Sequence, residues 1–332
     1  MPKIIAQISP QRSTQYSSIA GTLAPVELCL SPAGKNLSSI ETVTLGRQEY
    51  LKFKIDDLKM DDKFFYELGN MSMTNSFALY FESIGSMTGP FLKPLEITCN
   101  HTLPYDLVIT RRYKGKTNEM FTHFLCNIAR FSSRFSDLRW HDLRIFDPLA
   151  GGGTTLFTAL YLGAEAIGVE KNLNDVQSTG TFLKQYTKEQ KIPCIFKEER
   201  LKKSGRKYWF TIGADKKKCL IINGDTIESP SLITGIKKPH FIVTDLPYGI
   251  QHWGRITDLL TKALPVWKSL LVPGGSIVMS WDSSRFTRKE MINLIKDTTS
   301  IMVLEGGVYE NMVHRVDRVI KERDVIVARK EE

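Results

Sequence analysis

The pattern of hydrophobic positions changes about a third of the way along the chain. Residues 1–105 show short alternating or β-branched runs, such as Lys3–Ile8 and Phe77–Phe81, and no long helical period. This pattern predicts a small β-rich or α+β domain. Across residues 143–295, apolar strand-like runs alternate with helical runs. That alternation predicts an α/β domain over residues 106–332, with a Rossmann-like, doubly wound and mostly parallel sheet.

Two further patterns indicate how the second domain begins and ends. Thr117-Asn118-Glu119 is typical of a helix N-terminus. The helix that follows is expected to bury a stripe made of Phe121, Phe124, Leu125, Ile128 and Ala129. Near the end of the chain, apolar runs at residues 312–320 and 324–328 predict a closing hairpin with residues 321–323 as its turn.

The most informative stretch is Asp147-Pro148-Leu149-Ala150-Gly151-Gly152-Gly153-Thr154-Thr155, between an apolar strand and a helix. Consecutive glycines let a backbone approach a ligand closely, and threonines cap helices. The loop has Thr154 where a P-loop needs a lysine, and Leu156 where a dinucleotide fingerprint needs its third glycine. Two interpretations remain, a structural tight turn and a nucleoside-binding loop of a different kind. The acid and the proline ahead of the glycines favour the second.

Acidic residues stand at the ends of successive predicted strands, in register with this glycine loop. Glu170 ends the next strand, where an acid in nucleotide-binding units hydrogen-bonds ribose hydroxyls. Asp225 ends a third strand and is a candidate contact for an adenine amine. The strand Phe241–Asp245 runs directly into Leu246-Pro247-Tyr248-Gly249, at the edge where open α/β sheets bind ligands. Each acid alone is more often a solvated strand end, but their joint placement favours a binding site.

The charge distribution points to a polyanionic partner. The chain carries a formal charge of +9, and an insertion at residues 197–218 holds nine basic and three acidic residues. Its Tyr208-Trp209-Phe210 run suits base stacking or the packing of a β-hairpin, and we favour packing. For the basic residues we favour phosphate contacts over a solvated face. The nucleic-acid-binding candidates are Arg111, Arg112, Lys114, Lys202, Lys203, Arg206, Lys207, Lys216, Lys217 and Lys218.

Several other classes of protein are disfavoured. No apolar run approaches the ~18 residues of a membrane span, and the apolar run at the start is too short for a secretory signal, so we expect a cytoplasmic protein. The five cysteines are widely spaced and contain no C-x-x-C pair, which argues against a disulfide framework and against a zinc site. No metal is expected.

The two loop motifs resemble those of the class I S-adenosylmethionine-dependent amino-methyltransferases. Asp147-Pro148-Leu149-Ala150-Gly151-Gly152-Gly153-Thr154 looks like the methionine-binding D-P-x-x-G-x-G-T motif, and Asp245-Leu246-Pro247-Tyr248 looks like the D/N-P-P-Y/F motif that holds a planar amine. The resemblance covers residues 106–332 and implies S-adenosylmethionine as cofactor. It implies cofactor contacts at Thr117, Asn118, Asp147, Pro148, Gly151, Gly153, Thr154, Thr155, Glu170, Asp225 and Thr226.

The resemblance also implies catalytic roles around the second motif. The Asp245 carboxylate and the Leu246 main-chain carbonyl would accept the two N–H bonds of an exocyclic amine. Pro247 would fix the turn, and Tyr248 would stack on the base. Most relatives have proline where this chain has Leu246, which keeps the carbonyl and restores an N–H.

Within that class, the order of the motifs, the lead-in Tyr113–Glu119 and the Asp245–Gly249 variant look most like the tRNA guanine-N2 methyltransferases usually joined to THUMP domains. This closer resemblance implies tRNA processing, with RNA as partner and residues 1–105 taking part in substrate recognition. A small activating protein subunit is a further candidate partner.

Two alternatives stay open. A DNA adenine-N6 or cytosine-N4 amino-methyltransferase would use the same chemistry. DNA enzymes with this motif order usually carry a recognition domain after the second motif, whereas about 80 residues follow it here, and an aspartate in place of a serine leans away from cytosine. A non-catalytic RNA-binding protein that keeps the cofactor is disfavoured by the intact Asp245 and Tyr248.

Overall fold

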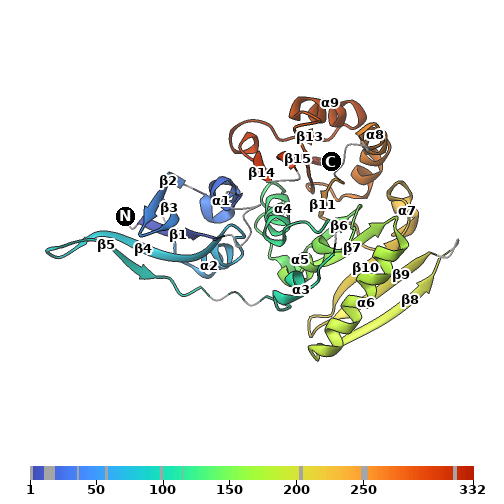
Figure 1. Ribbon diagram of the computed structural model, residues 1–332, viewed down its shortest axis with the longest axis horizontal. Coiled ribbons are helices and arrows are strands. Elements are labelled where there is room, and N and C mark those ends of the chain that lie inside the picture. Colours follow the sequence, from blue (N-terminus) through green and yellow to red (C-terminus); the bar gives the residue numbers. More distant parts are fainter. Residues whose placement is uncertain are drawn as a thin grey trace. The chain divides into compact units, whose positions relative to one another are not determined.

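The chain folds into two compact units (Figure 1). Unit 1 comprises Met1–Asn100 and Glu305–Asp324, and unit 2 comprises His101–Leu304 and Val325–Glu332. Unit 1 therefore takes in a short piece from near the end of the sequence. The computed structural model describes residues 3–10, 19–35, 37–56, 59–97, 99, 101–113, 115–201, 205–247, 253–316 and 320–332, without the side chains of 253–255, 320 and 321.

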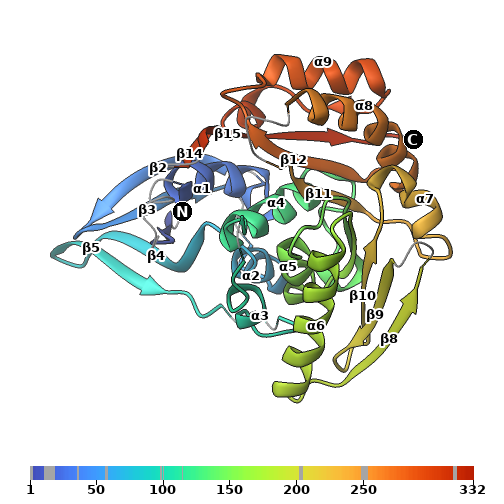
Figure 2. The same cartoon turned by 45° about the vertical axis from the view of Figure 1, so that its right-hand side comes forward.

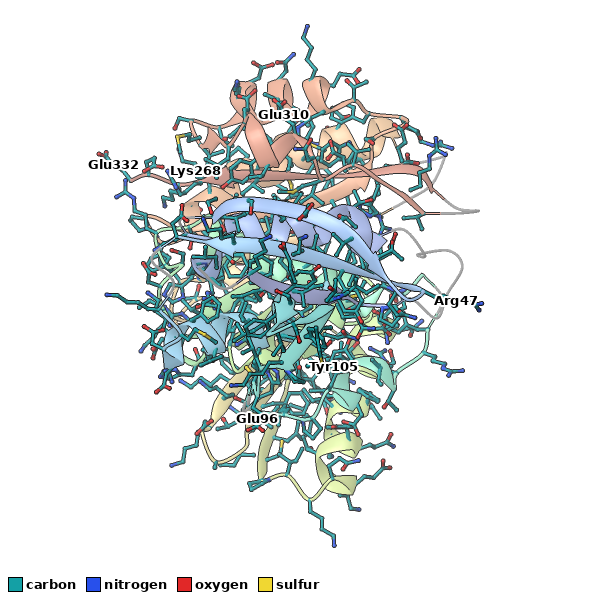
Figure 3. The ribbon with its side chains drawn as sticks, turned by 90° about the vertical axis from the view of Figure 1, so that its left-hand side faces the viewer. Arg47, Glu96, Tyr105, Lys268, Glu310 and Glu332 are labelled. Atoms are coloured by element: carbon teal, nitrogen blue, oxygen red, sulfur yellow. The ribbon has the colours of Figure 1, made fainter. Side chains whose placement is uncertain are left out.

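Unit 1 is built on a five-stranded antiparallel sheet in the order β2-β3-β1-β4-β5. Arg47, in the turn between β2 and β3, projects away from this sheet (Figure 3). The elements from the first hundred residues are β1 (Lys3–Ile8), α1 (Ile19–Leu30), the 3-10 turn η2 (Pro32–Gly34), β2 (Leu37–Leu45), β3 (Gln48–Ile55), α2 (Asp62–Gly69), β4 (Thr74–Ile84) and β5 (Met87–Pro94). Unit 1 also holds η6 (Gly307–Glu310), β14 (His314–Val316) and the first half of β15 (Ile320–Arg329).

Helix α1 explains why the sequence of residues 1–105 shows no long helical period of hydrophobic positions. It is apolar on almost every side, and Ile19, Leu23, Val26 and Leu28 are among its buried residues. A helix that is buried all round carries no polar face, and therefore no amphipathic period. Its buried Glu27 accepts hydrogen bonds from the main-chain N–H groups that lead into β4.

Unit 2 is a mixed sheet in the order β13-β15-β12-β11-β6-β7-β10-β9-β8. The five central strands β12, β11, β6, β7 and β10 are parallel, and β9 and β8 extend the sheet antiparallel to β10. The strands are β6 (Arg144–Asp147), β7 (Glu165–Glu170), β8 (Cys194–Arg200), β9 (Arg206–Ile212), β10 (Lys217–Asn223), β11 (Phe241–Asp245), β12 (Ser276–Asp282) and β13 (Met302–Val303).

Helices cover both faces of this sheet (Figure 2). The helices of unit 2 are α3 (Asp106–Ile109), α4 (Glu119–Phe131), α5 (Thr154–Leu162), α6 (Leu173–Glu189), α7 (Ser229–Leu232), α8 (Trp253–Leu270) and α9 (Arg288–Thr298), with 3-10 turns η3 (Trp140–Asp142) and η5 (Thr226–Glu228). Helices α4, α5 and α6 pack on one face, and α8 and α9 share a core with the other. In the central part of the sheet, β10-β7-β6-β11-β12, the strand order reverses direction beside β6, and this opens a ligand crevice at the carboxyl ends of β6 and β11.

The predicted fold class is confirmed, with a Rossmann-like, mostly parallel sheet and a separate antiparallel N-terminal sheet. Helix α4 begins as expected, because the Asn118 side chain accepts a 2.9 Å hydrogen bond from the N–H of Phe121. The predicted stripe is buried, and Thr122, His123, Asn127 and Arg130 are buried as well.

The expected turn of the closing hairpin was wrong. Residues 322 and 323 lie inside β15, where Arg323 pairs with His314 of β14 and is buried. Their charges suggested a solvated turn, but the strand continues through them, and the residues that connect β14 to β15 lie outside the described part of the chain. No helix among the described residues is both long and apolar enough to cross a membrane.

The two units differ in charge. Unit 1 holds 13 Lys and Arg against 15 Asp and Glu, whereas unit 2 holds 32 against 21. The positive charge of the chain therefore belongs entirely to unit 2, and attraction to a polyanion should act there.

Candidate active site

The glycine loop joins β6 to α5. Gly151 and Gly153 have φ of 49° and 87°, in the left-handed region that favours glycine. Gly152 is required for another reason, since an added Cβ would lie 2.2 Å from Cζ of Tyr113. The hydroxyl groups of Tyr113 and Thr154 share a hydrogen bond, so the tyrosine ring lies against the loop.

Asp147 ends β6 at the start of this loop and is 3% exposed. Burial raises the pKa of its carboxyl to about 6, although hydrogen bonds from the Thr155 hydroxyl and the Leu149 N–H favour the charged form. The negative charge of Glu170 adds to the upward shift. A buried carboxylate of this kind is stabilised by a cation placed beside it.

Glu170, at the end of β7, is tied to the glycine loop. Its Oε2 accepts a 2.9 Å hydrogen bond from the N–H of Gly151, and its Oε1 accepts one of 2.7 Å from the N–H of Asn172. Each carboxylate oxygen has further lone-pair capacity. The glutamate is therefore held rigidly and can still accept hydrogen bonds from the hydroxyls of a ligand.

Asp245, at the end of β11, is held by two hydroxyl groups. Its Oδ2 accepts a 2.7 Å hydrogen bond from Thr117, and its Oδ1 accepts one from Ser280 of the neighbouring strand β12. Ser280 is fully buried and lies directly beside Asp245 in the parallel ladder. The carboxylate orientation is therefore fixed from two directions.

Leu246 continues the β11 ladder. Its N–H donates a 2.9 Å hydrogen bond to the carbonyl of Ser280, and its side chain is buried in the core. A proline at this position would have no N–H to donate. Pro247 follows and is exposed, whereas the predicted stacking residue Tyr248 lies outside the described residues.

One cavity of about 450 Å³ brings the two motifs together. Gly151, Gly152 and Thr154 of the glycine loop line it, as do Asp245, Leu246 and Pro247. The carboxylates at its wall are Asp147, Glu170, Asp175 and Asp245, and the described residues that line it include no lysine, arginine or histidine. This cavity, called the loop cavity below, therefore suits a cationic ligand.

A second cavity of about 400 Å³ shares Leu149 and Glu170 with the loop cavity. Its lining includes Pro148, Asp225 and Thr226, three of the predicted cofactor contacts. The Asp225 carboxylate accepts 3.1 Å hydrogen bonds from the N–H of Ile227 and from the Lys171 ammonium. Thr226 is buried, and its hydroxyl accepts a 2.8 Å hydrogen bond from the Trp267 indole. The two cavities are therefore neighbours, with Glu170 at the wall of both.

The lead-in to α4 does not present all its basic groups to solvent. The Arg111 guanidinium donates to the Gly152 carbonyl and to the hydroxyls of Thr179 and Ser178, the latter two at 2.7 Å. Its predicted phosphate contact therefore competes with three internal hydrogen bonds. Arg112 is exposed, and Lys114 lies outside the described residues.

The basic insertion runs along β8, β9 and the start of β10 and so reaches both edges of the sheet. Because Ile222 pairs with Lys207 and Lys217 pairs with Ile212, the end of β8 and the start of β9 lie at the carboxyl edge of β10, and the β9–β10 turn lies at the other edge. At 3.3 Å per residue, the seven-residue β10 separates these two edges by about 20 Å. Lys202 and Lys203 stand between β8 and β9 in the sequence and lie outside the described residues.

The described lysines and arginines of the insertion divide into inward and outward groups. The Lys207 ammonium donates to the Leu232 carbonyl at 3.0 Å, and the Lys217 ammonium donates to the His141 carbonyl at 2.6 Å. Burial lowers the pKa of both lysines. Arg206 pairs with Glu198 at 3.1 Å, while Lys216 and Lys218 are exposed at the far edge.

The preference for packing of the aromatic run is confirmed for two of its residues. Tyr208 and Phe210 are 6% and 1% exposed, and both rings contact Phe196 of β8. Tyr208 also lies against Gly180 of α6, where an added Cβ would come within 2.9 Å of the ring. These rings are core residues and are not available for base stacking.

Among the residues of this site that sequence reasoning did not single out are Tyr113, Asp175 and Ser280. The signal for Ser280 is its place near the carboxyl end of an otherwise apolar strand, next to the strand that ends in Asp245. Tyr113 and Asp175 carry no comparable signal, because only the folding of the lead-in and of α6 brings them to the loop cavity.

No family model and no curated protein sequence matches this chain. Among solved structures, TrmN from Thermus thermophilus aligns over 99% of this chain and 100% of its own, at 11% identity and a TM-score of 0.47. The T. thermophilus 16S rRNA N2 guanine methyltransferase RsmC, in complex with AdoMet and guanosine, aligns over 89% and 59%, at 14% identity and a TM-score of 0.38. The rRNA methyltransferase AviRa from Streptomyces viridochromogenes aligns over 68% and 92%, at 12% identity and a TM-score of 0.40. Methyltransferases, the class that the motifs resemble, are thus found among the structures similar to this chain.

Proposed function

We propose that this chain is an S-adenosylmethionine-dependent methyltransferase that modifies an exocyclic amine of a nucleobase in RNA, and that its target is guanine N2 in tRNA. The observation that carries the proposal is the loop cavity. Residues of the glycine loop and Asp245 line it together. The charged side chains among its described lining residues are all carboxylates.

The residues of the two cavities fit S-adenosylmethionine, whose sulfonium and ammonium groups outweigh its carboxylate by one positive charge. The acids of the loop cavity favour that charge, and Gly151, which has open space where a Cβ would stand, leaves room for close backbone contact. Glu170 would hold the ribose hydroxyls, and Asp225 and Thr226 would line the adenine pocket. When bound, the cofactor supplies an electrophilic methyl group.

Asp245 and Leu246 are placed to prepare the amine. The lone pair of an exocyclic amine is conjugated with its ring, so the nitrogen is a poor nucleophile while it stays planar. The Asp245 carboxylate and the Leu246 carbonyl would accept its two N–H bonds and so direct the lone pair to one side. Positive charge grows on the nitrogen during transfer, and a fixed carboxylate stabilises that charge more than it stabilises the ground state. Asp245 can then accept the released proton.

The RNA part of the proposal is supported by charge. Unit 2 holds both the cavities and the excess of basic residues. The end of β8 and the start of β9, between which Lys202 and Lys203 stand in the sequence, lie at the carboxyl edge of β10, and Asp225 of the second cavity follows β10 in the chain. Phosphates that approach this edge would bring a neighbouring base toward the loop cavity. The choice of guanine N2 in tRNA rests on the resemblance of the motifs.

Variants at Asp245 test the catalytic assignment. Asp245→Asn and Asp245→Ala should bind S-adenosylmethionine normally in calorimetry but transfer methyl groups at least about 100-fold more slowly, equivalent to roughly 3 kcal/mol of lost transition-state stabilisation. Asp142→Asn, at the opposite edge of the sheet, is the matched control and should transfer at the wild-type rate. Full activity of Asp245→Ala would contradict the assignment.

A further inference from the structure

Asp245 is connected to the glycine loop through one short segment of the chain. This segment, residues 111–113 and 115–117, is called the strap below. It precedes α4, and Tyr113, Gly115 and Thr117 of the strap line the loop cavity. The strap contacts both halves of the site, since Arg111 and Tyr113 touch the glycine loop and Thr117 touches Asp245.

The first end of the strap is fastened to the glycine loop. Arg111 donates to the Gly152 carbonyl, and its guanidinium lies 4.9 Å from the Tyr113 ring centroid and 5.8 Å from that of Phe182. Tyr113 packs so closely on Gly152 that no side chain fits between them. Burial lowers the pKa of Arg111, and its guanidinium donates to the Thr179 and Ser178 hydroxyls inside the protein. Arg111 therefore holds the strap against the glycine loop and is not a free surface cation.

The middle of the strap is fastened as well. The Lys116 ammonium donates 2.8 Å hydrogen bonds to the carbonyls of Val108 and Arg111, and it pairs with Glu119 in the first turn of α4. Lys116 thus ties the end of α3, the start of the strap and the start of α4 together. Thr117 follows directly and has little freedom to move its hydroxyl away from Asp245.

We propose that the strap is a positioning device, in which Thr117 sets the orientation of the Asp245 carboxylate and Arg111 keeps the strap on the glycine loop. The inference rests on the proposed function, because it assigns Thr117 to the alignment of the amine-binding carboxylate. Thr117 was expected among the cofactor contacts, and its 2.7 Å hydrogen bond to Oδ2 gives it a second role. Ser280 fixes the other oxygen from the rigid sheet, so Thr117 controls the rotation that remains.

Two variants of Thr117 distinguish the effect of its hydroxyl on kcat from the effect of its side-chain shape. Thr117→Val keeps the shape and removes the donor, whereas Thr117→Ser keeps the donor. We expect Thr117→Val to lower kcat about 10-fold or more while the dissociation constant of S-adenosylmethionine changes less than 3-fold, and Thr117→Ser to keep kcat within 2-fold of wild type. Equal losses in both variants, or none in Thr117→Val, would overturn the role of the hydroxyl.

Hydrogen exchange tests the fastening without any catalysis. In the cofactor-free protein, Arg111→Gln should raise amide exchange both in peptides spanning residues 108–117 and in those spanning 148–156. Arg112→Gln, an exposed neighbour on the same segment, is the matched control and should leave both at the wild-type rate. If amide exchange in Arg111→Gln equals that in Arg112→Gln, the proposal that Arg111 keeps the strap on the glycine loop is wrong. If the wild-type protein transfers no methyl group, the proposed function fails, and the exchange result still decides whether the strap exists.

Discussion

The carboxylate of Glu170 accepts a 2.9 Å hydrogen bond from the main-chain N–H of Gly151, which joins the end of β7 to the glycine loop that follows β6. The same carboxylate lines both cavities. A single acid at the end of β7 therefore shapes the glycine loop, and in the proposed function it also accepts hydrogen bonds from the ribose hydroxyls. Under the proposed function, Glu170 would contact the cofactor from both cavities, since it lines both together with Leu149.

Replacement of Glu170 should weaken cofactor binding. Glu170→Ala removes an acceptor for ligand hydroxyls and the anchor of Gly151, and a hydrogen bond to a charged group contributes about 1.5–3 kcal/mol. We expect the dissociation constant of S-adenosylmethionine to rise about 10- to 100-fold in calorimetry. Glu165→Gln, at the other end of β7, should bind like wild type. Unchanged affinity in Glu170→Ala would remove Glu170 from the cofactor site.

The buried Asp147 predicts a pH dependence of stability. Its pKa is raised to about 6 in the folded protein, chiefly by burial, from an ordinary value of 3.8. The folded state therefore holds this proton more tightly than the unfolded state does, so stability falls as the pH rises from about 4 to about 6 and is then constant with respect to this group. At 1.36 kcal/mol per unit, the loss amounts to about 3 kcal/mol at neutral pH.

Asp147→Asn isolates this contribution. The replacement side chain cannot ionise. The unfolding free energy of the variant minus that of the wild type should therefore increase as the pH rises from about 4 to about 6. Denaturant unfolding at pH 4, 5, 6 and 7 measures the difference. The same variant should bind S-adenosylmethionine more weakly at pH 7, because it lacks the negative charge that favours a cation. A difference that does not change with pH would show that Asp147 titrates normally.

The hydrogen bond from the Leu246 N–H predicts that proline, which the resembled motif has at this position, would destabilise this protein. Leu246→Pro removes the N–H that donates to the Ser280 carbonyl and leaves that buried acceptor without its partner, at about 1–3 kcal/mol. Leu246→Met keeps the N–H and most of the buried volume, and should cost less than about 1.5 kcal/mol. Chemical denaturation compares the two. Equal stability of both variants would show that the ladder bond contributes nothing.

The two ends of the basic insertion predict different effects on RNA binding. Charge reversal at Lys202 and Lys203, which stand between β8 and β9 in the sequence, should weaken binding and reduce the slope of log affinity against log salt by about 0.7 for each phosphate that the protein no longer neutralises. Lys216 and Lys218, about 20 Å from the end of β8 and at the other edge of the sheet, provide the matched control, and their reversal should change the slope less. Filter binding over a range of salt concentrations measures both. If the far-edge pair has the larger effect, RNA binds at the opposite edge of the sheet.

Much of the second unit follows from the sequence because its strands end in recognisable chemistry. Asp147, Glu170 and Asp245 close apolar runs, and parallel strands bring their carboxyl ends to one edge of the sheet. The placement of these acids around one cavity therefore needs only the strand pattern and the strand order. The Asn118 cap of α4 is local as well, and its hydrogen bond is the expected one.

The remaining features depend on tertiary contacts that no local pattern encodes. Lys207 and Lys217 belong to a run of basic residues, yet their ammonium groups donate to carbonyls 25 and 76 positions away. Ser280 becomes part of the site only through the register of β12 against β11. Arg111 looks like a surface cation because its partners on α6 lie more than 60 positions further along the chain.

The central claim is tested most directly by identifying the methylated nucleoside. The purified protein would be incubated with methyl-labelled S-adenosylmethionine and, separately, with total tRNA, rRNA and genomic DNA, and each nucleic acid would be digested to nucleosides and analysed by mass spectrometry. We predict that the label appears in tRNA as N2-methylguanosine and that Asp245→Ala reduces it at least about 100-fold. Label found only in DNA, as N6-methyladenine or N4-methylcytosine, would contradict the account.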